Sequence, residues 1–189
     1  MPLGARQHRM LRTFVVDQGV AAGAVFLAVL LLASWTDVRS RRIPNWITVV
    51  GMLAGLGFHA ARGVGPLGVG ALGVAAAFMV ALPFFLSGAL GGGDAKLLMV
   101  VGAFFGPVDL LLASLVIALV GGALALGEAA RQGALGPVLA SCGHLILRWV
   151  ASAGQHAGGL SGKRRLAVPY GVAISAGSVF WWLIRTGVA

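Results

Sequence analysis

Two aspartates with unusual neighbours are the residues of this sequence whose types and spacing could do chemistry. Asp94 closes the glycine run 91–93 and lies between two strongly apolar stretches. Asp37 follows another apolar stretch and precedes an arginine-rich segment that ends at Pro44. An ionisable group in or near a bilayer is unfavourable, so by default it indicates a functional site.

The chemistry available to such a pair is hydrolysis. Two carboxylates a few ångströms apart in a low-dielectric site share one proton and titrate as a pair. The ionised member takes a proton from water while the protonated member donates to a peptide carbonyl oxygen, as in aspartic proteases. This needs no metal or cofactor, and we expect none, because the four histidines are scattered and Cys142 is the only cysteine. We therefore interpret Asp37 and Asp94 as a catalytic pair.

The composition indicates a membrane protein. The 189 residues are 59% hydrophobic and 10% charged, whereas a soluble domain carries about 25% charged residues. The net charge of +9 comes from basic residues at the ends of apolar spans, without the interleaved aromatics of a nucleic-acid surface. We expect an all-α, polytopic helical bundle that binds no nucleic acid. The chain is too short for a second domain, so residues 1–189 are predicted to form one transmembrane domain.

The apolar stretches approach the ~20 residues that cross a hydrocarbon core. Six spans are predicted, over 16–35, 46–60, 67–86, 95–105, 110–126 and 170–185. The interval 128–165 is expected to be cytoplasmic or interfacial and to include an amphipathic helix. Turn residues set these bounds: Asn45 is expected to cap the second span, Gly106-Pro107 to end the fourth, Asp109 to cap the fifth and Pro169 to begin the sixth.

The order of the spans predicts where the aspartates lie. Two spans separate Asp37 from Asp94, so both are expected on one side of the membrane. The basic residues on that side are Arg39, Arg41, Arg42, Lys96, Arg131, Arg148, Lys163, Arg164 and Arg165, against Arg6, Arg9, Arg12, Arg62 and Arg185 on the other. By the positive-inside rule the face with the two aspartates is cytoplasmic.

Three stretches resemble the signature sequences of type IV prepilin peptidases, which are GxGD aspartic proteases of bacterial and archaeal inner membranes. They read DVRSRRIPN at 37–45, GGGDAK at 91–96 and VPYG at 168–171. The spacing is most similar to that of the short subgroup associated with tight-adherence (Flp) pili. The resemblance implies that Asp37 and Asp94 are catalytic, and that the reaction is cleavage of a prepilin leader peptide at the cytoplasmic boundary of the inner membrane.

Other residues of these stretches are expected to bind substrate or shape the site. They are Gly91, Gly93, Lys96, Asn45, Pro169 and Tyr170. The glycines would let an extended substrate backbone approach the carboxylates. Lys96 would orient the pair or tune its acidity, and Tyr170 would line the site, although lysines near a bilayer often snorkel and tyrosines often belong to interfacial belts.

The resemblance also defines the expected partners and one departure. The partners are a prepilin or pseudopilin substrate, the lipid bilayer and the pilus assembly machinery. Larger family members carry an N-terminal cytoplasmic insert with paired CxxC motifs and also N-methylate the mature pilin. This sequence has a single cysteine and no such insert, so we predict peptidase activity without methyltransferase activity.

Three alternatives stay open. One is a related peptidase that acts on archaellin or pseudopilin precursors. Another is a small transporter or channel component in which Asp37 and Asp94 relay protons, which predicts mid-span carboxylates and often an internal repeat. The sequence places both carboxylates at span ends and shows no convincing repeat. The third is an inactive assembly partner, against which the retained motifs argue.

Overall fold

The computed structural model describes residues 3–88, 90–133, 136 and 170–186, of which 3–18 are described by their backbone alone. Its elements are α1 (Leu3–Ser40), α2 (Asn45–Ala60), α3 (Val64–Leu86), α4 (Gly92–Arg131) and α6 (Tyr170–Thr186). Every regular element in these ranges is a helix, so the all-α prediction is confirmed. Most of the predicted interfacial interval 128–165 lies outside the described residues, as does Pro169.

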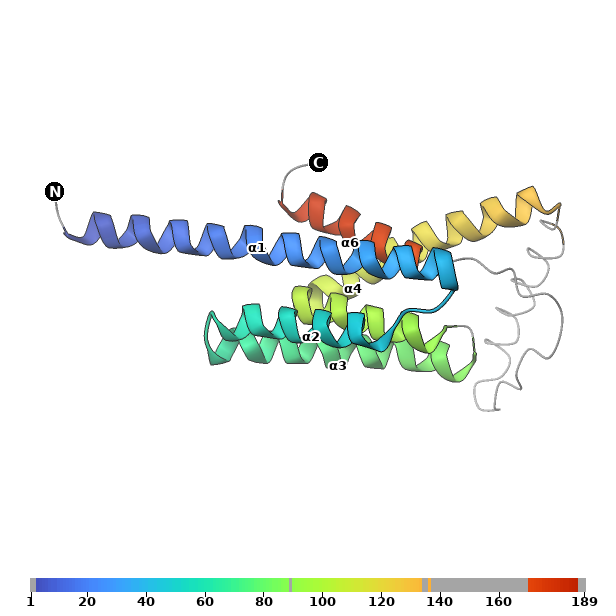
Figure 1. Cartoon of the computed structure of the whole chain (residues 1–189), viewed down its shortest axis with the longest axis horizontal. Coiled ribbons are helices and arrows are strands. Elements are labelled where there is room, and N and C mark those ends of the chain that lie inside the picture. The colour runs from blue at the N-terminus through green and yellow to red at the C-terminus, as the bar shows by residue number, and fades with distance from the viewer. Residues whose placement is uncertain (1–2, 89, 134–135, 137–169, 187–189) are drawn as a thin grey trace.

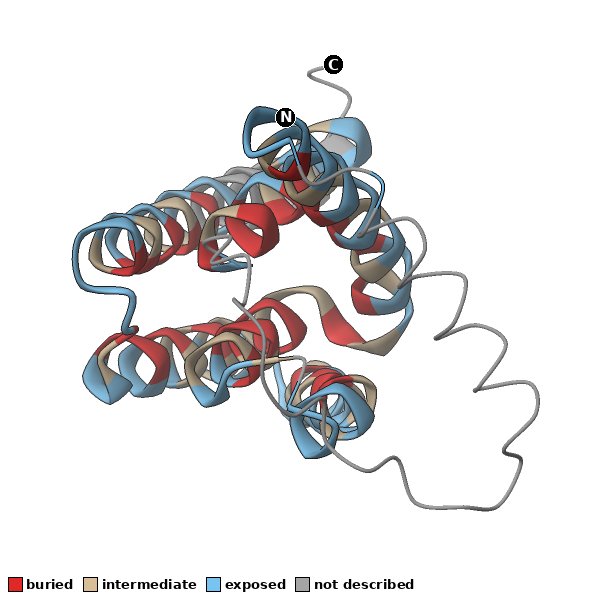
Figure 2. Cartoon of the chain, turned by 90° about the vertical axis from the view of Figure 1, so that its right-hand side faces the viewer, coloured by how far each residue is buried: buried red, intermediate tan, exposed pale blue. Residues whose placement is uncertain are grey.

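Three of these helices are long and apolar enough to cross a membrane. They are the Gly19–Ser40 part of α1, α3 and α4, while α2 is a shorter apolar helix. Large apolar side chains cover their outer surfaces, with Leu31, Leu53 and Leu119 exposed by 70%, 65% and 74%. Figure 2 shows the buried residues on the sides of the helices that face one another. Such an extensive apolar exterior suits hydrocarbon rather than water. The predicted membrane bundle is confirmed, and the count of six spans stays a prediction.

Helix α4 is too long for one crossing and is sharply bent. Its 40 residues would extend about 60 Å at 1.5 Å per residue, twice the ~30 Å hydrocarbon core. Gly106 interrupts the helix with φ 76° and ψ 177°, and Pro107 follows. Figure 1 shows α4 starting beside α3, bending at mid-length and returning to the same end of the bundle. The predicted break between the spans 95–105 and 110–126 therefore lies at this kink.

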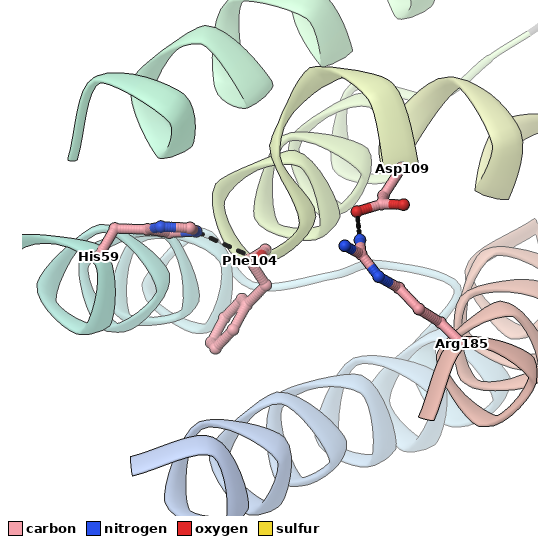
Figure 3. A network of polar contacts seen from close by, with 4 residues as sticks. All are labelled: His59, Phe104, Asp109 and Arg185. Carbon is pink, nitrogen blue, oxygen red and sulfur yellow. Dashed lines mark hydrogen bonds and ion pairs between the residues drawn. The ribbon is translucent and has the colours of Figure 1, made fainter. Parts of the chain in front are cut away.

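The expectation that Asp109 caps the fifth span is wrong, because the second segment of α4 begins at Pro107, after the kink at Gly106, and Asp109 lies inside the first turn of that segment. Its carboxylate instead forms an ion pair with Arg185 of α6. Because Gly106 is non-helical and Pro107 has no N–H, carbonyl groups of the turn before the kink lose their helical partners. The His59 Nε2 of α2 lies 3.2 Å from the carbonyl oxygen of Phe104 in that turn (Figure 3). These contacts hold α2 and α6 against the kink.

The predicted small-residue face of α3 packs directly on α4. A Cβ atom on Gly73 would overlap the Gly102 carbonyl group, and a Cβ on Gly102 would overlap that of Gly73. A Cβ on Gly70 would lie 2.9 Å from the His59 ring, and the neighbouring Ala77 is fully buried. In lipid, where apolar side chains gain little from leaving the solvent, such close backbone packing is a main source of helix association.

Gly73→Ala is expected to destabilise the bundle, because the added methyl group meets backbone atoms that cannot rotate away. Overpacking of this kind lowers the free energy of unfolding by about 1–3 kcal/mol or more. The matched control is Gly68→Ala on the same helix, whose added Cβ would have no neighbour within 4 Å among the described residues. Gly68→Ala should be neutral or stabilise by up to about 1 kcal/mol. Thermal unfolding in detergent measures both, and equal Tm values for the two variants would contradict the α3–α4 contact.

Candidate active site

Asp37 lies in the last turn of α1, where the helix extends beyond the predicted end of the span at residue 35. In these last turns the Thr36 hydroxyl donates to the Ala33 carbonyl oxygen at 2.9 Å, and the Ser40 hydroxyl donates to the Thr36 carbonyl oxygen at 2.7 Å. Both hydroxyl groups are thereby bound to their own helix. Asp37 is only 7% exposed, so its carboxylate is buried in the bundle.

The buried Asp37 carboxylate is bound by the backbone at the start of α6. The Gly171 N–H donates to Asp37 Oδ2 at 2.9 Å. Gly171 is the second residue of α6, so this N–H is one that the helix itself leaves without an acceptor. The N-terminus of a helix also favours a negative charge through its dipole. A carboxylate 134 positions away in the sequence thus takes the place of an N-terminal cap.

Glycine at position 171 leaves room for this carboxylate. A Cβ atom there would lie 2.7 Å from Asp37 Oδ2 and 3.1 Å from Asp37 Cβ. A larger residue would therefore require the Asp37 side chain to move from its place beside α6.

Asp94 lies in the first turn of α4, because the helix begins at Gly92 and not at the predicted residue 95. Gly91 precedes the helix in an extended conformation, with φ −73° and ψ 152°. Asp94 accepts a hydrogen bond from the Gly91 backbone N–H, so the third helical residue reaches back to the cap position as in a capping box. The glycine run thus forms the start of a helix that holds its own carboxylate.

Asp37 and Asp94 line one pocket. Its volume is about 340 Å³, and its walls are Asp37, Arg41, Arg42, Ile43, Gly91, Gly92, Gly93 and Asp94. The two carboxylates are close enough to interact electrostatically. Gly93 brings α4 near the linker before α2, since a Cβ on it would lie 3.2 Å from Ile43 Cβ. The structure therefore brings the two predicted aspartates together with Gly91 and Gly93.

The other predicted site residues lie elsewhere. Lys96 Nζ donates to Asn45 Oδ1 at 2.8 Å, which ties α4 to α2, but neither residue lines the pocket. Asn45 is the first residue of α2 rather than its cap, a position that Pro44 occupies. Tyr170 begins α6, is 41% exposed and does not line the pocket.

Sequence reasoning missed several residues that surround the two carboxylates. They are Arg41, Arg42, Ile43, Gly92 and Gly171. Gly171 had one signal, since a glycine at the second position of a helix that follows Pro169 presents a free N–H. Within the residues that the structure describes, no three histidine, cysteine, aspartate or glutamate side chains come together to hold a metal ion. The pocket offers two carboxylates, backbone N–H donors and two guanidinium groups, which suits acid–base chemistry on a polar substrate.

Comparison with known proteins also indicates a peptidase. The model of the type IV leader peptidase family matches residues 24–126, a range that contains both aspartates. Two similar curated proteins are named prepilin leader peptidase/N-methyltransferase, one from Aeromonas salmonicida and one from Aeromonas hydrophila. Each is 32% identical over 151 residues, which is 72% of this chain and 52% of the relative. The chain thus spans about half the length of the curated relatives it matches. No solved structure matches it significantly.

Gly171→Ala is expected to destabilise the protein by about 2 kcal/mol or more, because the methyl group displaces the Asp37 carboxylate and breaks a hydrogen bond to a charged group. Asp37→Ala in the same chain should relieve part of that clash, so the double variant should be less destabilised than the sum of the two single variants. Thermal unfolding of the four proteins measures this coupling. Gly122→Ala, whose Cβ would have no described neighbour within 4 Å, is the control, and simple additivity would contradict the contact.

Proposed function

The chain belongs to the type IV leader peptidase family, and from that premise we propose that it is a membrane-embedded aspartic endopeptidase for type IV, Flp-like prepilins. It removes the leader peptide at the cytoplasmic boundary of the inner membrane, ahead of the pilin's hydrophobic helix. The observation that carries the proposal is the pocket shared by Asp37 and Asp94. These residues come from different helices, and both lie where a substrate could enter from the membrane surface.

The proposed reaction needs only the two carboxylates and water. One carboxylate is ionised and takes a proton from the attacking water, while the other is protonated and donates to the carbonyl oxygen of the cleaved bond. The carboxylate that took the proton from water then gives it to the leaving nitrogen as the C–N bond breaks. A hydroxyl group of the tetrahedral intermediate returns its proton to the other carboxylate, so the pair regains its starting state. The Gly171 N–H keeps the Asp37 carboxylate oriented, and the exposed Gly91 and Gly92 leave room for an extended substrate backbone beside Asp94.

The proposed location follows from the same arrangement. Helices α1 and α3 end, and α2, α4 and α6 begin, at the end of the bundle that carries the pocket (Figure 1). Arg39, Arg41, Arg42, Lys96 and Arg131 belong to this end, and the span order assigns Arg148, Lys163, Arg164 and Arg165 to the same side, against five arginines on the other. This excess supports a cytoplasmic pocket. The pilus assembly machinery is a proposed partner on this side. N-methylation of the product is not part of the proposal.

Asp37→Asn and Asp94→Asn should each lower prepilin cleavage by about 10² to 10⁴-fold, because asparagine keeps the shape of the side chain but cannot exchange a proton. The double variant should be hardly slower than either single variant, since the two groups act as a unit. Cleavage of purified prepilin in reconstituted membranes measures this, with membrane insertion checked for each variant.

Asp109→Asn is the matched control, because Asp109 belongs to the same helix as Asp94 but pairs with Arg185. It should retain near-normal cleavage. Near-normal cleavage by Asp37→Asn or Asp94→Asn would remove that aspartate from the mechanism. If the wild type cleaves none of several prepilins, the proton-relay and assembly-partner interpretations become the stronger ones.

A thiol-labelling experiment tests the orientation. In a Cys142→Ser background, Ser87→Cys places a thiol after α3 at the pocket end, and Arg62→Cys places one between α2 and α3 at the other end. Both positions are exposed. A membrane-impermeant reagent should label Arg62→Cys in intact spheroplasts and Ser87→Cys only after permeabilisation. The reverse pattern would contradict a cytoplasmic pocket.

A further inference from the structure

The linker between α1 and α2 contains a strained residue beside the pocket. Arg41 has a φ of 50°, and among the described residues no other non-glycine residue has a positive φ. Its N–H donates to the Asp37 carbonyl oxygen at 2.8 Å, which closes the left-handed turn that usually ends a helix with glycine. A residue with a Cβ atom is strained in this conformation, and such strain is characteristic of functional sites.

The side chain at this strained position lines the pocket together with Arg42, Asp37 and Asp94. Arg41 and Arg42 are exposed, and neither forms an ion pair with a residue in the described part of the chain. Arg41 interacts with Asp37 only electrostatically, without a hydrogen bond between their side chains. The guanidinium donors are therefore free to bind a group that enters the pocket.

The charges of the pocket favour an anion. Two carboxylates that share one proton carry one negative charge, and the two guanidinium groups carry two positive charges. The pocket as a whole is thus positive, although its reaction centre is acidic. A guanidinium group can donate two parallel hydrogen bonds to one carboxylate. A neutral or basic side chain of the substrate could not take the place of that carboxylate.

We propose that Arg41, together with Arg42, is a specificity-determining residue that binds an acidic side chain of the substrate within a few residues of the cleaved bond. The inference rests on the proposed peptidase function. A glycine at position 41 would relieve the backbone strain but would give up this contact. The acidic residue must lie close to the cleaved bond because the arginines and the aspartates line the same small pocket.

The experiment is a cycle of variants in enzyme and substrate. The substrates are a purified prepilin with one acidic side chain within four residues of the cleaved bond and the same prepilin with the corresponding amide. The enzymes are the wild type, Arg41→Asn, Arg41→Lys and the control Arg39→Asn, which changes an exposed arginine outside the pocket. Asparagine tolerates the left-handed conformation, so Arg41→Asn should fold as well as the wild type, and its Tm checks this.

With the acidic substrate, Arg41→Asn should lower kcat/KM about tenfold or more, mainly through KM. With the amide substrate, Arg41→Asn should lose only what the electrostatic interaction of Arg41 with Asp37 contributes. The ratio of kcat/KM for the acidic substrate to that for the amide substrate should therefore fall from the wild-type value to about one. Arg41→Lys should keep part of the preference for the acid, and Arg39→Asn should keep all of it.

Other results overturn the proposal. An equal loss of kcat on both substrates would make Arg41 an electrostatic partner of Asp37 instead of a substrate ligand. Equal cleavage of the two substrates by the wild type would exclude recognition of the acid. An effect of Arg41→Asn that appears only in vesicles with anionic lipid would assign the guanidinium to a lipid headgroup. Absence of cleavage by the wild type would overturn the proposed function, and this inference with it.

Discussion

The structure of the site depends on the burial of a carboxylate in a chain that has few polar side chains to offer it. Asp37 is almost fully buried, and a buried charge without hydrogen bonds is strongly unfavourable. The donors come from the backbone: the first turn of α6 binds Asp37, and the start of α4 binds Asp94. Two helix N-termini therefore converge on one pocket, and each supplies N–H groups that its own helix does not use.

Glycines allow the helices to reach these positions in three distinct ways. Gly171 leaves space for the Asp37 carboxylate, Gly73 and Gly102 allow backbone contact between α3 and α4, and Gly106 adopts the positive φ at which α4 turns back. The turn matters for the site because it returns α4 to the pocket end, where α6 begins. Contacts at the far end, between Asp109 and Arg185 and between His59 and Phe104, hold the turn in place.

The sequence predicts those features that depend on local patterns. The apolar stretches predict the helices, Gly106-Pro107 predicts the turn in α4, and the span count places Asp37 and Asp94 at one end. The helix bounds near the site do not follow the apolar pattern, because α1 continues past Trp35 through polar residues to Ser40 and α4 begins at Gly92, inside the glycine run. The Gly171 contact depends on tertiary packing between distant segments. Lys96, predicted to act on the aspartates, binds Asn45 because α2 happens to begin within its reach.

The position of the carboxylates also bears on which chemistry the bundle can support. A proton relay needs titratable groups that connect to both sides of a membrane. Here the two aspartates share a pocket at one end, while Asp109 at the other end is paired with Arg185 (Figure 3). The described interior of the bundle consists mainly of alanine, leucine, isoleucine and valine side chains. Carboxylates at one end of a bundle, beside exposed glycines and arginines, therefore fit the proposed hydrolysis of a polar backbone better than a relay across the membrane.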